Sequence, residues 1–131
     1  MAREVPSTYV PARNTIFLGF AISYAEALGA EAVFIGANAI DFSGYPDCRP
    51  AFYRAVQKMV QTGTKHKKIK ILTPLLHLTK AQIIRRGQQL KAPLALTWSC
   101  YKGGRRPCGV CDSCRLHKAG FWFAGGLSPG V

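Results

Sequence analysis

The chain has 131 residues, which suits one domain with a modest core and is too short for two. Hydrophobic residues make up 48% of it, which argues against wholesale disorder, and no apolar run approaches the length of a membrane span. Eighteen Lys and Arg face six Asp and Glu. The formal net charge of +12 therefore favours anionic partners such as nucleotides, phosphates, carboxylates or nucleic acid.

The N-terminus lacks the apolar core of a secretion signal, so we expect a cytoplasmic protein whose five cysteines stay reduced. Basic residues concentrate in the second half, where Asp112 is the one acidic residue after Asp47. The run at residues 65–70 holds four of the lysines. Such a run is usually a solvated surface, and on its own it does not identify a ligand.

Residues 14–28 are predicted to form a helix that Asn14 or Thr15 caps and Gly29 ends. Apolar residues lie on nearly every side of this helix, which predicts that it is largely buried. Residues 32–36 follow as a continuous apolar run. Such a run is typical of a strand buried on both faces of a parallel sheet.

Further elements follow a loop at residues 37–50. They are a helix at 51–62 with the apolar stripe Phe52, Val56, Met59 and Val60, a strand at 69–76, and a helix that starts with a Thr79 to Gln82 capping box and ends near Leu90. This alternation predicts an α/β fold with a parallel sheet. Two strands are too few for a stable sheet, so the chain is expected to be the second half of a larger domain.

The loop at residues 37–50 follows the C-terminal end of a strand, the edge where open α/β sheets bind ligands. Its carboxylates suit a guanine-like N–H edge, and its guanidinium suits a carboxylate or phosphate. The alternative is a loop whose polar groups satisfy its own backbone. Cys48 is a weaker candidate, as a nucleophile, because no histidine is near it in sequence. The candidate substrate-binding residues of the loop are Asn38, Asp41, Tyr45, Asp47 and Arg49.

Cys100, Cys108, Cys111 and Cys114 form a C-x7-C-x2-C-x2-C array. A C-x2-C step lets two thiolates bind one ion from a tight turn, and Gly109 gives that turn its backbone freedom. Four protein ligands leave no position for water, so the array predicts a structural zinc ion. An iron–sulfur cluster is the competing interpretation, although no further cysteine followed by proline continues the array.

Three motifs resemble the 7-cyano-7-deazaguanine synthase family: TYVPARN at residues 8–14, SGYPDCRP at 43–50, and LTWSCY at 96–101. The resemblance implies a Rossmann-like fold of the ATP-pyrophosphatase type, with zinc held by the four cysteines. It also implies an ATP-dependent ligase that converts 7-carboxy-7-deazaguanine and ammonia into the nitrile preQ0, a queuosine precursor. Arg13, in the first motif, joins the candidate substrate-binding residues.

The family's Ser-Gly-Gly-x-Asp-Ser loop, which binds pyrophosphate, does not occur in this sequence. We therefore expect the chain to bind zinc but to need an N-terminal half for catalysis, and a homo-oligomer is also considered. A zinc-containing basic nucleic-acid-binding module and an inactive remnant remain as alternatives. Nucleic acid is not the expected partner, because residues 65–70 lack stacking aromatic side chains, and no membrane partner is expected.

The expected organisation has three parts. Residues 1–97 form the C-terminal part of a nucleotide-binding α/β domain, residues 98–121 form the zinc-binding segment, and residues 122–131 form a flexible tail. The zinc-binding segment is expected to lack regular secondary structure from Trp98 onward, because a metal ion takes the place of a core there.

Overall fold

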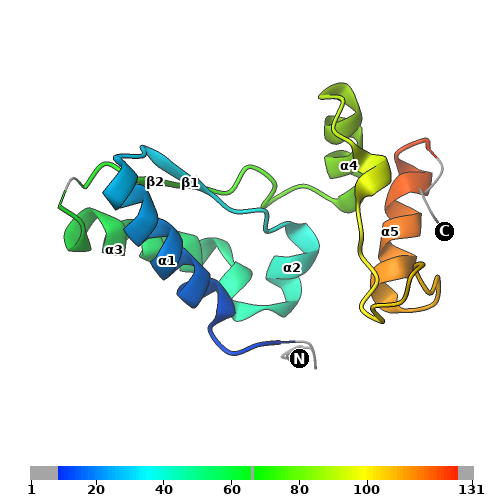
Figure 1. The fold of residues 1–131 in the computed structure, drawn as a ribbon, viewed down its shortest axis with the longest axis horizontal. Coiled ribbons are helices and arrows are strands. Elements are labelled where there is room, and N and C mark those ends of the chain that lie inside the picture. The colour runs from blue at the N-terminus through cyan, green and yellow to red at the C-terminus, as the bar shows by residue number, and fades with distance from the viewer. Residues whose placement is uncertain (1–8, 66, 127–131) are drawn as a thin grey trace. The chain divides into compact units, whose positions relative to one another are not determined.

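The computed structural model describes residues 9–65 and 67–126, so Thr8, His66 and the last five residues of the predicted tail lie outside it. The chain forms two compact units, Met1–His77 and Leu78–Val131 (Figure 1). This differs from the single domain that the length predicts. The boundary expected at residues 97/98 falls within the second unit and stays a prediction. Within the described residues, no helix is both long and apolar enough to cross a bilayer.

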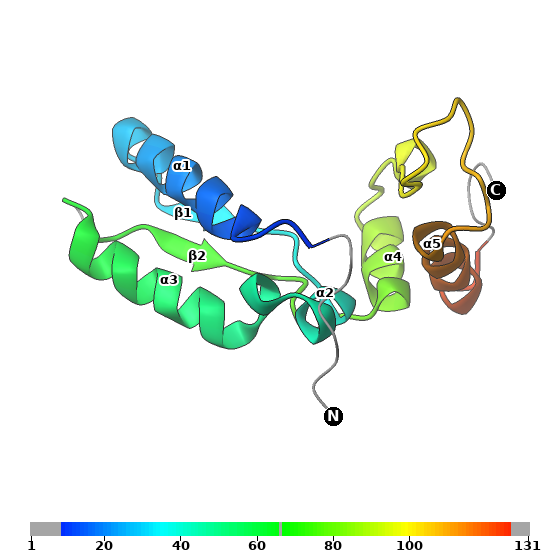
Figure 2. The same cartoon turned by 90° about the horizontal axis from the view of Figure 1, so that it is seen from below.

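The first unit is a parallel pair of strands with helices on one face. Its elements are α1 (Arg13–Leu28), β1 (Ala32–Phe34), α2 (Ala39–Gly44), the 3-10 helix η1 (Pro46–Cys48), α3 (Pro50–Gly63) and β2 (Lys70–Leu72). The strands are parallel, with Ala32 beside Lys70 and Phe34 beside Leu72. Helices α1 and α3 lie on the same face of the strands (Figures 1 and 2). The predicted parallel sheet with helices is thus confirmed for these two strands.

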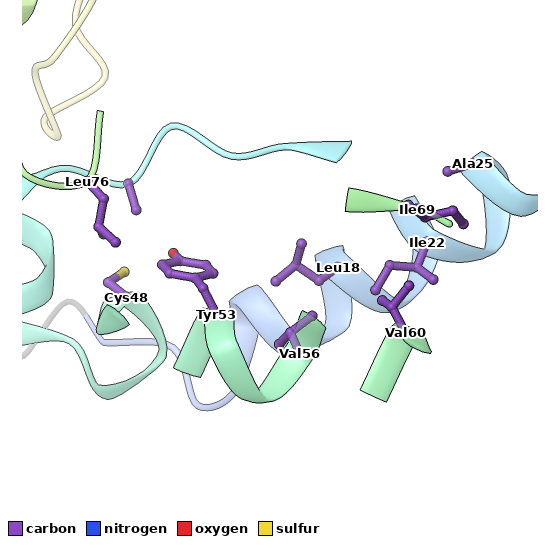
Figure 3. Close-up of a cluster of buried hydrophobic side chains, with 10 residues drawn as sticks. Leu18, Ile22, Ala25, Cys48, Tyr53, Val56, Val60, Ile69 and Leu76 are labelled. Atoms are coloured by element: carbon purple, nitrogen blue, oxygen red, sulfur yellow. The ribbon is translucent and has the colours of Figure 1, made fainter. Parts of the chain in front are cut away.

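The core of the first unit lies between these two helices and the strands (Figure 3). Leu18 and Ile22 of α1 pack in one cluster with Val56 and Val60 of α3 and with Ile69, just before β2. Val60 has no exposed surface. Burying an aliphatic side chain of this size contributes about 1.5–3 kcal/mol, so this cluster is the main source of stability in the unit.

Helix α1 is buried along one face, and the prediction of a largely buried helix is wrong for the described structure. Asn14, Leu18, Ile22 and Ala25 recur every three or four positions and form the buried face. The other apolar residues face solvent because the described chain offers α1 a single layer to pack on. They are Ile16, Phe17, Phe20, Tyr24 and Leu28.

Strand β1 is also less buried than its apolar sequence predicts. The strand ends at Phe34 rather than Gly36, and Phe34 is 69% exposed. Strand β2 is shorter than the predicted 69–76. In α3 the predicted stripe is confirmed at Val56 and Val60, whereas Met59 is 51% exposed. The exposed positions belong to faces that the described residues do not cover.

The second unit contains two packed α-helices, with a 3-10 helix and irregular segments between them. Its elements are α4 (Lys80–Gln89), the 3-10 helix η2 (Leu94–Leu96) and α5 (Asp112–Phe123). The predicted capping box starts α4: the Gln82 N–H donates to Thr79 Oγ1 at 3.4 Å, and the Thr79 N–H donates to Gln82 Oε1 at 2.8 Å. Helix α5 was not predicted, because it begins inside the cysteine array.

Helices α4 and α5 approach closely at Gly120. A Cβ at this position would lie 2.6 Å from Cγ of Lys80 and 3.0 Å from Cδ1 of Ile84. Both distances are shorter than ordinary van der Waals contact. The absence of a side chain at position 120 is therefore what allows the two helices to touch.

We predict that Gly120→Ala lowers the free energy of unfolding by about 1–3 kcal/mol, because the added methyl group overpacks the contact. The measurement is urea unfolding of the metal-loaded chain. Gly19→Ala is the matched control: Gly19 is exposed in α1 with no atom near its missing Cβ, and alanine there should stabilise by up to about 1 kcal/mol. A neutral or stabilising effect of Gly120→Ala would contradict the close contact.

Candidate metal centre and polar segment

The four predicted ligand cysteines converge in the second unit. Their sulfur atoms all lie within 4.8 Å of one another, and the sulfurs of Cys108 and Cys114 are 3.9 Å apart. A tetrahedral ion with metal–sulfur bonds of about 2.3 Å separates its sulfurs by roughly 3.8 Å. The cluster, made of Cys100, Cys108, Cys111 and Cys114, therefore has the size and the donor atoms to hold a metal ion.

Tight turns of the backbone hold these sulfur atoms in place. The backbone N–H groups of Lys102 and Cys108 both donate to Cys100 Sγ at 3.4 Å, and the Cys111 N–H donates to Cys108 Sγ at 3.4 Å. Gly109 has a φ of +71°, in the left-handed region that favours glycine. The backbone freedom that the sequence analysis assigned to Gly109 is thus confirmed.

The hydrogen bonds also favour the ligand form of the cysteines. Backbone N–H groups lower the pKa of Cys100, Cys108 and Cys111, since donors stabilise a thiolate. Burial instead raises the pKa of Cys114 to about 12. A bound cation would offset that effect, because coordination to a metal deprotonates a thiol. The donor set therefore fits a thiolate-binding metal ion.

Helix α5 positions the deepest of the four ligands. Cys111 is its N-cap residue, and Cys114, His117 and Phe121 share its buried face. The His117 ring lies 4.9 Å from the Phe121 ring, and its Nδ1 lies 3.1 Å from Oγ of Ser99. Burial lowers the pKa of His117, and the charge of Lys80 lowers it further, so the imidazole is neutral at pH 7.

In the first unit, two predicted substrate-binding residues cap α2. The side-chain oxygen of Asn38 accepts the Ile40 N–H at 3.0 Å. Oδ2 of Asp41 accepts from the backbone and side-chain N–H groups of Asn38, at 3.1 and 2.7 Å. This capping box explains why the segment predicted as a loop contains a helix. These polar groups satisfy the local backbone, as the alternative interpretation of the sequence held.

Asp47 is buried and caps a different helix. Its Oδ2 accepts the backbone N–H of Asn14 at 3.0 Å, at the start of α1. The Asn14 side chain donates in return to the Asp47 carbonyl oxygen at 3.0 Å and to Cys48 Sγ at 3.2 Å. A carboxylate at a helix N-terminus is favourable because it opposes the helix dipole. The helix begins at Arg13 with Ala12 as its N-cap residue, so neither Asn14 nor Thr15 caps it.

Cys48 and Tyr53 are buried next to this bridge (Figure 3). Burial is the main cause that raises the pKa of Cys48, with Asp47 second, so its thiol is protonated at neutral pH. Burial also raises the pKa of Tyr53. The Tyr53 hydroxyl is buried, and it makes no well-formed hydrogen bond among the described residues. A buried, protonated thiol is a poor nucleophile, and Cys48 contributes to the core.

Three predicted substrate-binding residues remain accessible. Arg13 and Arg49 are exposed, and Tyr45 is half-buried with its ring 6.3 Å from that of Tyr9. The contact between Asn14 and Asp47 joins the segments that carry them. The structure thus gathers two of the motifs through a contact between residues 33 positions apart, and Asn14, which was predicted to cap a helix, is the residue that links them.

A sequence model of the family described as queuosine biosynthesis protein QueC matches residues 1–125. The chain belongs to the QueC family. A 7-cyano-7-deazaguanine synthase from Nostoc punctiforme is 54% identical, over 98% of this chain and 59% of the relative. Those from Thermoplasma acidophilum and Acetivibrio thermocellus are 56% and 57% identical, over 96% and 92% of this chain and 54% and 56% of each relative. This QueC chain therefore spans somewhat more than half the length of these curated relatives.

We predict that Asn14→Ala lowers the free energy of unfolding by about 1–3 kcal/mol, because it leaves the buried carbonyl of Asp47 without its donor. Urea unfolding at pH 7 measures the effect. Thr15→Ala, at the exposed neighbouring position, is the control and should change stability by less than about 0.5 kcal/mol. Equal stability of the two variants would show that the bridge does not hold the segments together.

Proposed function

We propose that this chain takes part in the ATP-dependent conversion of 7-carboxy-7-deazaguanine and ammonia into 7-cyano-7-deazaguanine, as a ligase of queuosine biosynthesis. The observation that carries the proposal is an identity of 54–57%, over nearly the whole chain, to relatives named 7-cyano-7-deazaguanine synthase. The converging cysteines support it, because the family resemblance implies such a centre. The nucleic-acid-binding and remnant alternatives are not favoured by these relatives.

The proposed reaction activates one carbon twice. Adenylation by ATP makes a carboxylate oxygen a leaving group, and ammonia displaces it to give an amide. A second activation makes the amide oxygen a leaving group, and its loss gives the nitrile. Positioning and charge stabilisation supply most of the rate enhancement in such steps. A net charge of +12 suits a reaction between a carboxylate and a polyphosphate.

We assign different roles to the candidate substrate-binding residues. The exposed guanidinium groups of Arg13 and Arg49 suit the carboxylate or a phosphate, and the ring of Tyr45 suits stacking on the base. The second carboxylate oxygen of Asp41 is the proposed acceptor for the N–H edge of the base. Asn38 and Asp47 contribute by holding α2 and α1: Tyr45 follows the end of α2, and Arg13 begins α1. The fold around them is proposed to be the Rossmann-like ATP-pyrophosphatase type.

A second polypeptide segment is proposed to complete the site. The sequence contains no Ser-Gly-Gly-x-Asp-Ser loop, and the chain matches 54–59% of the length of its relatives. The exposed apolar face of α1 and the exposed Phe34 provide a surface for the remaining part of the family fold. Phe17, Phe20, Tyr24 and Leu28 recur every three or four residues, as in a stripe that packs against a neighbour. The proposed partner is an N-terminal half, and a second copy of this chain is the alternative.

We predict that the chain alone forms no nitrile, and that adding a polypeptide with the Ser-Gly-Gly-x-Asp-Ser half restores turnover. The assay follows AMP release from ATP with 7-carboxy-7-deazaguanine and ammonium. In the mixture, Arg49→Ala should raise KM for the acid about tenfold, since a lost charge-assisted hydrogen bond is worth about 1.5–3 kcal/mol. Its thermal stability should stay unchanged, because Arg49 is exposed.

Arg54→Ala, at an exposed arginine of α3, is the control for a general loss of positive charge and should leave KM unchanged. Turnover by the chain alone would contradict the need for a second half. An Arg49→Ala variant that unfolds would contradict a role in binding. A mixture that forms no nitrile would reject the proposed reaction.

We propose that the metal is zinc and that its role is structural, because four thiolates fill a tetrahedral site and leave no position for water or substrate. We predict about one zinc ion per chain by elemental analysis of the reduced protein. Cys111→Ser should reduce the zinc content by more than half and lower the unfolding midpoint, since binding energy at such sites is folding energy. Cys48→Ser is the control and should keep its zinc. Iron with acid-labile sulfide in the purified protein would support the iron–sulfur alternative.

A further inference from the structure

Cys100 differs from the other three ligands in how it reaches the metal site. Cys108, Cys111 and Cys114 lie within seven consecutive positions, in the turn that leads into α5 and in the first turn of that helix. Cys100 comes eight positions earlier, on a stretch between η2 and α5 that forms no helix or strand. Its sulfur accepts hydrogen bonds from the backbone of the following loop, which shape that loop but do not attach the preceding residues to α5.

One side-chain contact does attach them. Oγ of Ser99, the residue before Cys100, lies 3.1 Å from Nδ1 of His117 in a hydrogen bond whose donor depends on the imidazole tautomer. His117 is 5% exposed and its ring contacts Phe121, so the imidazole is held firmly on α5. The Trp98 indole N–H donates to the Cys100 carbonyl oxygen at 2.9 Å, which ties residues 98–100 into one local turn.

His117 lies close to the metal site along α5, so a contact with its side chain can influence the position of the ligands. It lies one helical turn after Cys114 on the buried face of α5, and Cys114 is the most deeply buried of the four ligands. The hydrogen bond therefore joins Ser99, the residue before the first ligand, to His117, which lies one helical turn after the last ligand. It fixes the distance between the two ends of the array by a contact that needs no metal ion.

We propose that Ser99 and His117 form a clamp that positions Cys100 for metal binding. Both are positioning residues, because they act through Cys100 and touch no metal themselves. The clamp reduces the freedom that the loop between Cys100 and Cys108 loses on binding, so the ion meets a site already close to its final geometry. Membership in the QueC family does not by itself assign this role to Ser99 or His117. The proposed clamp rests on the proposed metal binding by the four cysteines and is independent of the proposed reaction.

The test compares zinc affinity, by chelator competition at pH 7.5, of the unaltered chain with Ser99→Ala and His117→Phe variants. Each variant should lose about 10–100-fold in affinity, the range found when partners that orient ligands are removed. The double variant should lose no more than either single one, because both remove the same bond. Ser99→Thr keeps the hydroxyl and His117→Asn keeps an acceptor near the position of Nδ1. Both should restore most of the affinity.

Binding of Co²⁺ provides a second measurement, the thiolate charge-transfer absorption, which a loss of side-chain packing alone would not change. Co²⁺ in the unaltered chain should show the thiolate charge-transfer intensity of four sulfur ligands, and Ser99→Ala should show about one quarter less if Cys100 detaches. His77→Phe, in the other unit, is the histidine control and should change neither measurement. Affinities within twofold of the unaltered chain in both single variants, or additive losses in the double variant, would overturn the clamp. Absence of metal uptake by the unaltered chain would overturn the metal site itself.

Discussion

Among the described residues, two parallel strands carry helices on one face and leave the other face open, and most features of the first unit follow from this constraint. The helices α1 and α3 bury Leu18, Ile22, Val56 and Val60 against the strands, which is enough to define the unit. The same arrangement leaves Phe34 and one side of α1 exposed. Parallel sheets are ordinarily covered on both faces, so this exposed apolar surface is where the proposed second polypeptide segment would pack.

The second unit is stabilised in a different way. It has few buried apolar side chains, and α4 and α5 meet through the small residue Gly120 rather than through a broad aliphatic layer. The four converging sulfurs take the place of a core for the segment between these helices. Arg105, Arg106 and Arg115 are exposed and lie near the four cysteines in the sequence, so they would help offset the negative charge of a metal–thiolate centre.

The convergence of the cysteines could be predicted from the sequence because it is largely local: the spacing of Cys108, Cys111 and Cys114 already implies turns that converge. The capping box at Thr79 was predicted for the same reason. Helix α2 was missed because its capping residues, Asn38 and Asp41, are also the residues typical of turns. The contacts of Asp47 with Asn14 and of Ser99 with His117 could not be predicted, since they join residues far apart in sequence.

The cap of α1 by Asp47 has a dynamic consequence. The first turn of α1 has no side-chain cap of its own, and the described backbone turns into it through Ala12 at a φ of 54°. The Asn14 amide can therefore exchange its hydrogen with solvent only when the segment around Asp47 moves away. Opening of the proposed substrate-binding segment and fraying of α1 are then a single event. The exchange rate of one amide in α1 would report how often that segment opens.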